Sequence, residues 1–129
     1  MLLDQANRLW IGTWGGGLSL FDPETQIFRN FTVQDGLPGN YILAIDEGPD
    51  GNLWIGSHPK MFDFIKHAKN KDHYSPSQVI MISSKDNEIK EVFLSDGSDL
   101  SGSSVAALYN NNLLIGAVFE DHFLHCVLD

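Results

Sequence analysis

The sequence has little cysteine and little positive charge. Cys126 is the only cysteine among 129 residues, so no disulfide can form within the chain and no cysteine-rich metal site can be built. Lysine and arginine number 8 against 17 aspartate and glutamate, and the formal net charge is −9. A surface of this sign repels phosphate backbones and anionic lipids, so we expect no nucleic acid and no membrane among the partners.

Long hydrophobic runs and long helical patterns are also missing. No apolar run approaches the roughly 18 residues of a membrane-spanning helix, and no stretch keeps a helical period for three turns. Residues Met1 to Gln5 lack the basic segment and apolar core of a signal peptide, so none is expected in this sequence. Hydrophobic residues still make up 43%, which is enough for the packed core of one ordinary domain.

A four-residue motif repeats along the chain. Leu9-Trp10-Ile11-Gly12 recurs 44 residues later as Leu53 to Gly56 and again, more loosely, as Leu113 to Gly116. Repeats of about 40 to 50 residues that hold several short strands are typical of β-propeller blades. The sequence therefore predicts an all-β fold of about three four-stranded antiparallel blades. We expect the motif to pack blade against blade, with its glycine relieving crowding.

The expected strands are the short apolar runs between turn residues. They are residues 9–12, 17–21, 27–33, 41–46, 53–56, 78–83, 89–95, 104–109 and 113–116. The first blade would lack its innermost strand and the last its outermost, so the chain would begin and end partway through a blade. Residues 61–76 form the one locally basic stretch and are predicted to be an exposed loop or a short helical excursion.

Residues 8–57 carry a series of short motifs in a fixed order. Leu-Trp-Ile-Gly-Thr, Gly-Gly-Leu, Phe-Asp-Pro, Asp-Gly-Leu-Pro and Gly-Asn-Leu-Trp-Ile-Gly follow one another. This part resembles the two-component regulator propeller repeat, whose blades form the periplasmic sensory part of bacterial hybrid histidine kinases. The resemblance implies a carbohydrate-binding sensory propeller in which Trp10, Trp14 and Trp54 hold the sugar. Tryptophans at such positions are more often blade core.

Residues 51–126 carry a second set of motifs. They include Gly-Asn-Leu-Trp-Ile-Gly-Ser-His-Pro from Gly51, Leu-Ser-Gly-Ser-Ser-Val-Ala from Leu100 and Leu-Ile-Gly-Ala-Val-Phe from Leu114. This part resembles the C-terminal part of the paraoxonase and arylesterase family of six-bladed, calcium-dependent lactonases. The two resemblances overlap on residues 51–57. We therefore expect a regulator-like unit over 1–57 and a paraoxonase-like unit over 58–129, joined as a chimera into one propeller unit; the alternative is a single divergent propeller gene.

The paraoxonase resemblance implies three pocket-lining residues, His58, Ser104 and Val118. The family's calcium ligands and the histidine pair that activates water come from blades before the matched stretch, so no position here inherits them. No catalytic residue or metal ligand is therefore assigned, and calcium is expected only if the lactonase hypothesis holds. His58 is the one weak catalytic candidate, because an imidazole can act as a general base near neutral pH.

The remaining titratable residues give no site. The polar cluster from Asp46 to Asn52 lacks the spacing of an EF-hand loop and is predicted to be a hairpin turn. His67 and His73 lie in the basic stretch and are expected to be solvated. His122 and His125 would face opposite sides of a strand and make a poor metal pair. Cys126 is expected to be a buried hydrophobic residue.

Blade number limits the assembly and the function. Closed propellers usually have four to eight blades, so three blades should not close. Two copies would supply six, and we expect a homodimer that completes a ring. The chain is then interpreted as a structural or assembly module without complete catalytic machinery; the alternatives are a calcium-dependent lactonase or arylesterase and a carbohydrate-binding sensory propeller. Both resembled families imply a periplasmic or secreted location.

Overall fold

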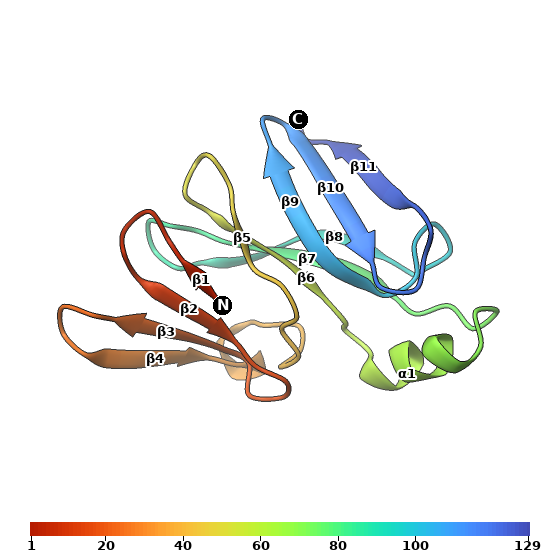
Figure 1. Cartoon of the computed structure of the whole chain (residues 1–129), viewed down its shortest axis with the longest axis horizontal. Coiled ribbons are helices and arrows are strands. Elements are labelled where there is room, and N and C mark those ends of the chain that lie inside the picture. The colour runs from red at the N-terminus through yellow and green to blue at the C-terminus, as the bar shows by residue number, and fades with distance from the viewer.

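The computed structural model covers residues 1–129 and contains three antiparallel sheets that stand side by side (Figure 1). The first sheet holds β1 (Leu2–Leu3), β2 (Leu9–Gly12), β3 (Leu18–Asp22) and β4 (Ile27–Phe31) in chain order. The second holds β5 (Asp46–Glu47), β6 (Leu53–Ser57), β7 (Ser77–Ile82) and β8 (Ile89–Ser95). The third holds β9 (Ser103–Tyr109), β10 (Asn112–Ala117) and β11 (Phe123–Val127). The predicted all-β fold and its blade-like sheets are confirmed.

Two helical segments interrupt the strands. The short 3₁₀ helix η1 (Val33–Asp35) follows β4 and begins at a capping box between Thr32 and Asp35. The helix α1 (Met61–Lys69) lies between β6 and β7, within the stretch for which a loop or a short helix was expected. With nine residues it is the longer of the two, and neither helix could cross a lipid bilayer.

The repeated motif forms the second strand of every sheet. Its copies are β2, β6 and β10, and each pairs with the strands on both sides of it. Two hydrophobic cores result, one between the first and second sheets and one between the second and third. The second sheet contributes to both cores, since Leu53 and Ile55 face the first sheet while Trp54 faces the third. The motif therefore packs blade against blade as expected.

Two strand predictions were wrong. The first sheet has an innermost strand, β1, which pairs with β2 through Leu2 and Leu3 and gives this blade four strands. Residues 41–46 do not form one continuous inner strand, because they hydrogen-bond to two sheets in turn. Tyr41 bridges Trp14 beside the first sheet, Ile42 bridges Ser57 of the second, and only Asp46–Glu47 is a strand. The other expected strands occur within one or two residues of their predicted bounds.

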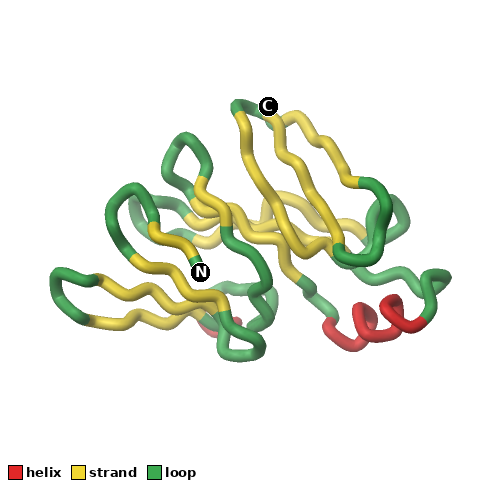
Figure 2. Tube along the Cα trace, viewed as in Figure 1, coloured by secondary structure: helices red, strands yellow, loops and turns green.

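The two ends of the blades differ. Strands pair through short polar hairpin turns at one end, at residues 4–8, 23–26, 48–52, 83–88 and 110–111. Five connections run at the other end, over residues 13–17, 32–45, 58–76, 96–102 and 118–122. Three of these, 32–45, 58–76 and 96–102, are longer than any turn at the first end, and α1 lies in the longest (Figure 2). Functional residues concentrate on loops that a rigid scaffold positions, so the end with the long connections is the candidate functional face.

Candidate functional site

The helix α1 is held on this face by tertiary contacts. A helix of nine residues is marginal by itself, and Lys60 at its N-cap makes no side-chain capping bond. Its sequence places Asp63 in the first turn and Lys66, His67 and Lys69 in the last, which suits the helix dipole. Phe64 and His67, three residues apart, are its two buried side chains. These two side chains anchor the helix to the connections from the neighbouring strands.

His58 lies under α1, in the interior. Its side chain is 1% exposed, and its ring stacks on that of Phe64 with centroids 3.7 Å apart at 20°. Neither ring nitrogen has a hydrogen-bond partner. Burial lowers the pKa of His58 to about 4, so the imidazole is neutral near pH 7. Because Phe64 covers it, His58 in this conformation is a packed side chain and not an accessible base.

Ser104 and Val118 lie close to this stack along the chain. Ser104 is buried near the start of β9, and the hydroxyl of its neighbour Ser103 donates to the main-chain oxygens of Ser57 and Gln78. Val118 is 59% exposed and precedes Phe119, whose ring lies 5.6 Å from that of Phe64. The fold thus brings the segments that carry the three residues together. None of the three lines either of the two larger pockets on this face.

The prediction that His67 is solvated was wrong. His67 is fully buried, and its Nδ1 lies 2.9 Å from the main-chain oxygen of His73. Its Nε2 lies 3.2 Å from a carboxylate oxygen of Glu120, close enough for an ion pair though not aligned for a hydrogen bond. Glu120 comes from the connection between β10 and β11. This contact between segments distant in the sequence removes His67 from solvent. His73 itself remains partly exposed, 3.3 Å from Asp63.

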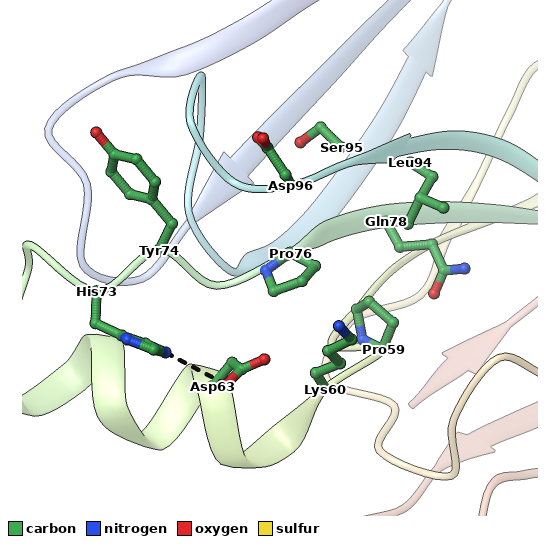
Figure 3. A pocket seen from close by; sticks show the side chains of 10 residues that line it. All are labelled: Pro59, Lys60, Asp63, His73, Tyr74, Pro76, Gln78, Leu94, Ser95 and Asp96. Carbon is green, nitrogen blue, oxygen red and sulfur yellow. Dashed lines mark hydrogen bonds and ion pairs between the residues drawn. The ribbon is translucent and has the colours of Figure 1, made fainter.

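A polar pocket of about 680 Å³ lies between α1 and the end of β8 (Figure 3). In that view His73 and Asp63 point toward one another across one wall, and Lys60 and Pro59 form another. The buried side chain of Gln78 is at its base, where it accepts a hydrogen bond from Ser57 and donates one to Glu91. Two carboxylates, those of Asp63 and Asp96, and the ammonium group of Lys60 line it. Its full lining is Pro59, Lys60, Asp63, His73, Tyr74, Pro76, Gln78, Leu94, Ser95 and Asp96.

An aromatic groove of about 550 Å³ lies on the other side of Lys60 and Asp63. Trp14 and Tyr41 form one wall with their rings edge to face, centroids 5.5 Å apart. The other wall is the first part of α1, and the full lining is Trp14, Tyr41, Pro59, Lys60, Met61, Phe62, Asp63 and Ile65. Trp14 is 64% exposed, and its loop is fixed because the backbone N–H groups of Gly15 and Gly17 both donate to the carbonyl of Asn40. The groove is preformed.

The three tryptophans do not form one sugar platform. Trp10 and Trp54 are buried in the two cores, as the blade-core alternative predicts, and only Trp14 is exposed. The indole N–H of Trp10 donates to the buried carboxylate of Asp4, which also pairs with Arg8. Burial opposes the ionisation of Asp4, but the hydrogen bonds from Arg8 and Trp10 outweigh it and lower its pKa.

The acidic side chains do not fit a calcium site. In the turn between β5 and β6, the Asp50 carboxylate accepts hydrogen bonds from the backbone and side chain of Asn52. Glu47 accepts the backbone N–H of Gln5. The cluster is the predicted hairpin turn, with its oxygens engaged in local bonds. Nowhere do three His, Cys, Asp or Glu side chains gather as metal ligands.

Two residues near the C-terminus, His122 and Cys126, differ from expectation. His122 lies before β11 and not on the strand, and a ring nitrogen of His122 lies 2.8 Å from the carbonyl of Asp99. That hydrogen bond raises the pKa of His122. His125 is on β11, bonded to Asn112. Cys126 is a free thiol and only half buried, at the edge of the second core.

Sequence reasoning missed Tyr41, Phe64, Phe119 and Glu120, which shape this face. A topological signal was available for them. In an antiparallel sheet alternate connections emerge at the same end, so residues 32–45, 58–76 and 118–122 must be neighbours once the strands are placed. The side-chain pairs within that group depend on packing that the pattern of strands does not specify.

Comparison with known proteins adds the family. The arylesterase family model matches residues 35–128, which include β5–β11 and α1. Serum paraoxonase/arylesterase 2 of Rattus norvegicus is 34% identical over 89 residues, covering 67% of this chain and 24% of the relative. Serum paraoxonase/arylesterase 1 of Mus musculus is 38% identical over 79 residues, covering 60% and 22%. Mechanosensory abnormality protein 6 of Caenorhabditis elegans is 30% identical over 89 residues, covering 64% and 23%.

The matches cover most of this chain but only a small part of each relative. The chain spans less than a quarter of the length of these relatives. The family match begins at residue 35, before the point at which the sequence motifs suggested a paraoxonase-like part, and it runs almost to the C-terminus. It covers most of the chain and the greater part of the candidate face. This chain belongs to the arylesterase family.

Proposed function

We propose that this chain forms the substrate-binding part of a propeller that hydrolyses esters or lactones. Family membership supports the reaction class, because relatives are named paraoxonase/arylesterase and, for one protein of Oryctolagus cuniculus, paraoxonase/lactonase. The matched residues include α1, three of the five connections at the functional face and residues 35–45 of a fourth. The chain's contribution under this proposal is to bind and orient the apolar part of the substrate.

The aromatic groove carries the proposal. Its walls are Trp14, Tyr41 and the first part of α1, and an aryl group can stack on indole and phenol rings held in this way. Lys60 and Asp63 at the rim offer polar partners to the ester or lactone group. Pro59 joins the groove directly to the buried His58. A flat apolar ligand with one polar end matches this lining.

No hydrolytic step is assigned to the chain's own side chains. His58 is neutral but sealed by Phe64, and both ring nitrogens of His67 face other groups of the chain. The carboxylates do not form a calcium site, so the metal that the family resemblance implies has no ligand set here. Under this proposal the chain binds the substrate and excludes water from its apolar part.

The binding step can be measured through Trp14. It is the only exposed tryptophan, so quenching of indole fluorescence by an aryl lactone such as dihydrocoumarin reports on the groove. We expect saturable quenching that Tyr41→Ala weakens, because Tyr41 forms the same wall of the groove and its removal leaves the reporter Trp14 in place. Phe28→Ala, an equally exposed aromatic position on β4, is the matched control and should leave binding unchanged. Quenching that stays linear with concentration, or that is unchanged in Tyr41→Ala, contradicts the proposal.

A second assay tests whether this chain binds the substrate without hydrolysing it. We expect no hydrolysis of phenyl acetate by this chain above the buffer rate, with calcium or with a chelator. Calcium-dependent turnover would favour a complete lactonase or arylesterase over a binding module. Titration with a cello-oligosaccharide in place of the lactone tests the carbohydrate alternative, since a pyranose ring also stacks on tryptophan, and saturation by the sugar alone would favour that alternative.

We also propose a secreted or periplasmic location. Several relatives are serum proteins by name, which supports a site of action outside the cytoplasm. The lone thiol of Cys126 places no demand on the redox state of the compartment. Fractionation of cells that express the whole gene, followed by detection with an antibody against this chain, tests the location. Retention in the cytoplasmic fraction contradicts it.

A further inference from the structure

The polar pocket and the aromatic groove are neighbours that share one wall. Pro59, Lys60 and Asp63, at the start of α1, line both of them. Beyond this wall the groove is bounded by aromatic rings, whereas the pocket is bounded by polar side chains at the end of β8. Both cavities are in the size range that encloses a small organic molecule. A single ligand that crosses the shared wall would therefore occupy both.

The polar pocket presents hydrogen-bond donors that the protein itself does not use. The ammonium group of Lys60 takes part in no ion pair, unlike that of Lys66 on the same helix. The hydroxyl oxygen of Ser95 accepts a backbone N–H two residues later, which leaves its own O–H group to donate. At the base of the pocket, Gln78 uses one of its two amide N–H bonds for Glu91. The second amide N–H remains.

The pocket also presents acceptors, on two sides. Asp63 lies on α1, and Asp96 lies opposite it, just after β8 (Figure 3). Asp63 contacts both His73 and Lys66 through the same oxygen, Oδ1. Asp96 accepts a hydrogen bond from the backbone N–H of Ser98. Since an ionised carboxylate has about four acceptor sites, each side chain can accept further hydrogen bonds from a ligand.

These donors and acceptors favour a neutral ligand that carries several hydroxyl groups. An anionic group only accepts hydrogen bonds and would meet the carboxylates of Asp63 and Asp96. A cationic group only donates them and would meet the ammonium of Lys60. A hydroxyl group is uncharged and does both. The ring of Tyr74 and the neighbouring Pro76 add apolar surface for the C–H groups of such a ligand.

We infer that the substrate is an ester of an aromatic acid with a polyhydroxylated alcohol such as a sugar. The inference rests on the proposed function and adds the second half of the substrate. The aryl group stacks on Trp14 and Tyr41 in the groove, and the hydroxyl groups occupy the polar pocket. The ester bond between them crosses the shared wall, where the ammonium group of Lys60 donates a hydrogen bond to the ester carbonyl.

Isothermal titration calorimetry of the chain with three ligands tests the inference. Methyl benzoate carries the aryl ester alone, glucose carries the hydroxyl groups alone, and 6-O-benzoylglucose carries both. We expect benzoylglucose to bind at least about tenfold more tightly than methyl benzoate, because joining the two halves spares the second one the entropy cost of association. Benzoylcholine and O-benzoylglycolate, which bring a cation and an anion to the pocket, should show no such gain.

Two variants test whether the polar pocket holds the hydroxyl groups. Ser95→Ala removes a donor and Asp96→Asn removes a charged acceptor, and neither side chain is buried, so both variants should remain folded by circular dichroism. Each should weaken benzoylglucose at least about threefold and leave methyl benzoate unchanged. Asp86→Asn is the matched control, because Asp86 is also exposed and accepts a backbone N–H two residues later, but lies at the opposite end of the blades.

Three results would overturn the inference. They are a benzoylglucose affinity no higher than that of methyl benzoate, a gain that persists in both Ser95→Ala and Asp96→Asn, and an equal gain for either charged ligand. The failure of this inference is distinguishable from that of the proposed function. If methyl benzoate binds and Tyr41→Ala weakens it, the groove stands and only the hydroxylated half of the substrate is wrong. If methyl benzoate does not bind, both proposals are wrong.

Discussion

His58 is a titratable side chain in a place that cannot accept charge. Its ring is buried, stacked on Phe64 and without a partner for either nitrogen. A buried polar group without a partner costs roughly 1–3 kcal/mol relative to one that is hydrogen-bonded. The fold therefore accommodates the neutral imidazole as an aromatic ring stacked on Phe64. The protonated imidazole would be a buried charge without a partner, which destabilises the folded state.

Stability should fall in mild acid because of His58. In the unfolded chain its pKa is near the ordinary 6.5, and in the folded chain it is about 4, so only the unfolded state takes up this proton between those values. The stabilisation is complete above pH 6.5 and is lost as the pH falls to 4, to a total of roughly 3 kcal/mol. Urea unfolding at a series of pH values measures this slope.

Substitution of His58 isolates its contribution. His58→Phe keeps the stack and removes the titratable nitrogens, so its free energy of unfolding should change less between pH 6.5 and 4.5 than that of the wild type. At pH 7.5 the variant should equal or exceed the wild type by about 1 kcal/mol. His125→Asn, which removes an exposed imidazole on β11, should keep the wild-type slope. An unchanged slope in His58→Phe would contradict the assignment.

At the scale of elements, Phe64 is one of the two buried side chains that hold α1 in position. Phe64 contacts His58 on one side and Phe119 on the other. Phe64→Ala should cost about 3–4 kcal/mol and release α1, because an isolated nine-residue helix is marginal. Hydrogen exchange should show loss of protection in Met61–Lys69 with β6 and β7 still protected. Phe62→Ala, two residues away on the exposed side, should change neither quantity, and equal effects from the two variants would contradict this role.

The motif glycines should differ in their tolerance of a methyl group. Gly56→Ala places a Cβ against the backbone of Ser104 and Val105, which cannot move without separating β6 from β9. We expect a loss of about 1–3 kcal/mol in thermal or urea unfolding. Gly116→Ala meets only the side chain of Val105 at 3.0 Å and should cost less within the chain. The reverse order would mean that β6 and β9 are not packed as closely as described.

The sequence predicted those strands whose position follows from local residues within a single repeat. Turn residues and the three copies of the motif located β2, β6 and β10 and most of the strands that pair with them, but not β1. The prediction failed where an element depends on a distant segment. Residues 41–46 divide their hydrogen bonds between Trp14 and Ser57, and His67 is buried because Glu120 and Phe119 reach it from the third sheet. No local pattern contains those contacts.

For the whole molecule, the second sheet couples the two cores. Val79 and Ile80 are adjacent on β7, yet Val79 packs in the core with the third sheet and Ile80 in the core with the first. Val79→Ala and Ile80→Ala should both lower the midpoint of one common transition. Tryptophan fluorescence, which reads Trp10 in one core and Trp54 in the other, should coincide with circular dichroism at every denaturant concentration. Two separate transitions would show that the cores unfold independently.

The candidate face was predictable at the level of the whole molecule but not in detail. The resemblance to the paraoxonase family predicted His58, Ser104 and Val118 as pocket-lining residues. The fold brings together the segments that carry them. Their accessibility could not be predicted, because it is set by where α1 lies and by which side chains it covers. The aromatic groove combines Trp14 with residues of α1, and these two segments lie far apart in the sequence.

The difference between the two ends of the blades also affects how such a protein can evolve. The connections between the second and third strands run over residues 13–17, 58–76 and 118–122, and only the middle one contains a helix. Lengthening a surface connection costs little chain entropy, with each doubling adding about 0.6 kcal/mol. The register of the strands on either side is unaffected. New recognition chemistry can therefore be acquired by insertion at that rim, one blade at a time, while the tight turns at the opposite rim keep the repeat in phase.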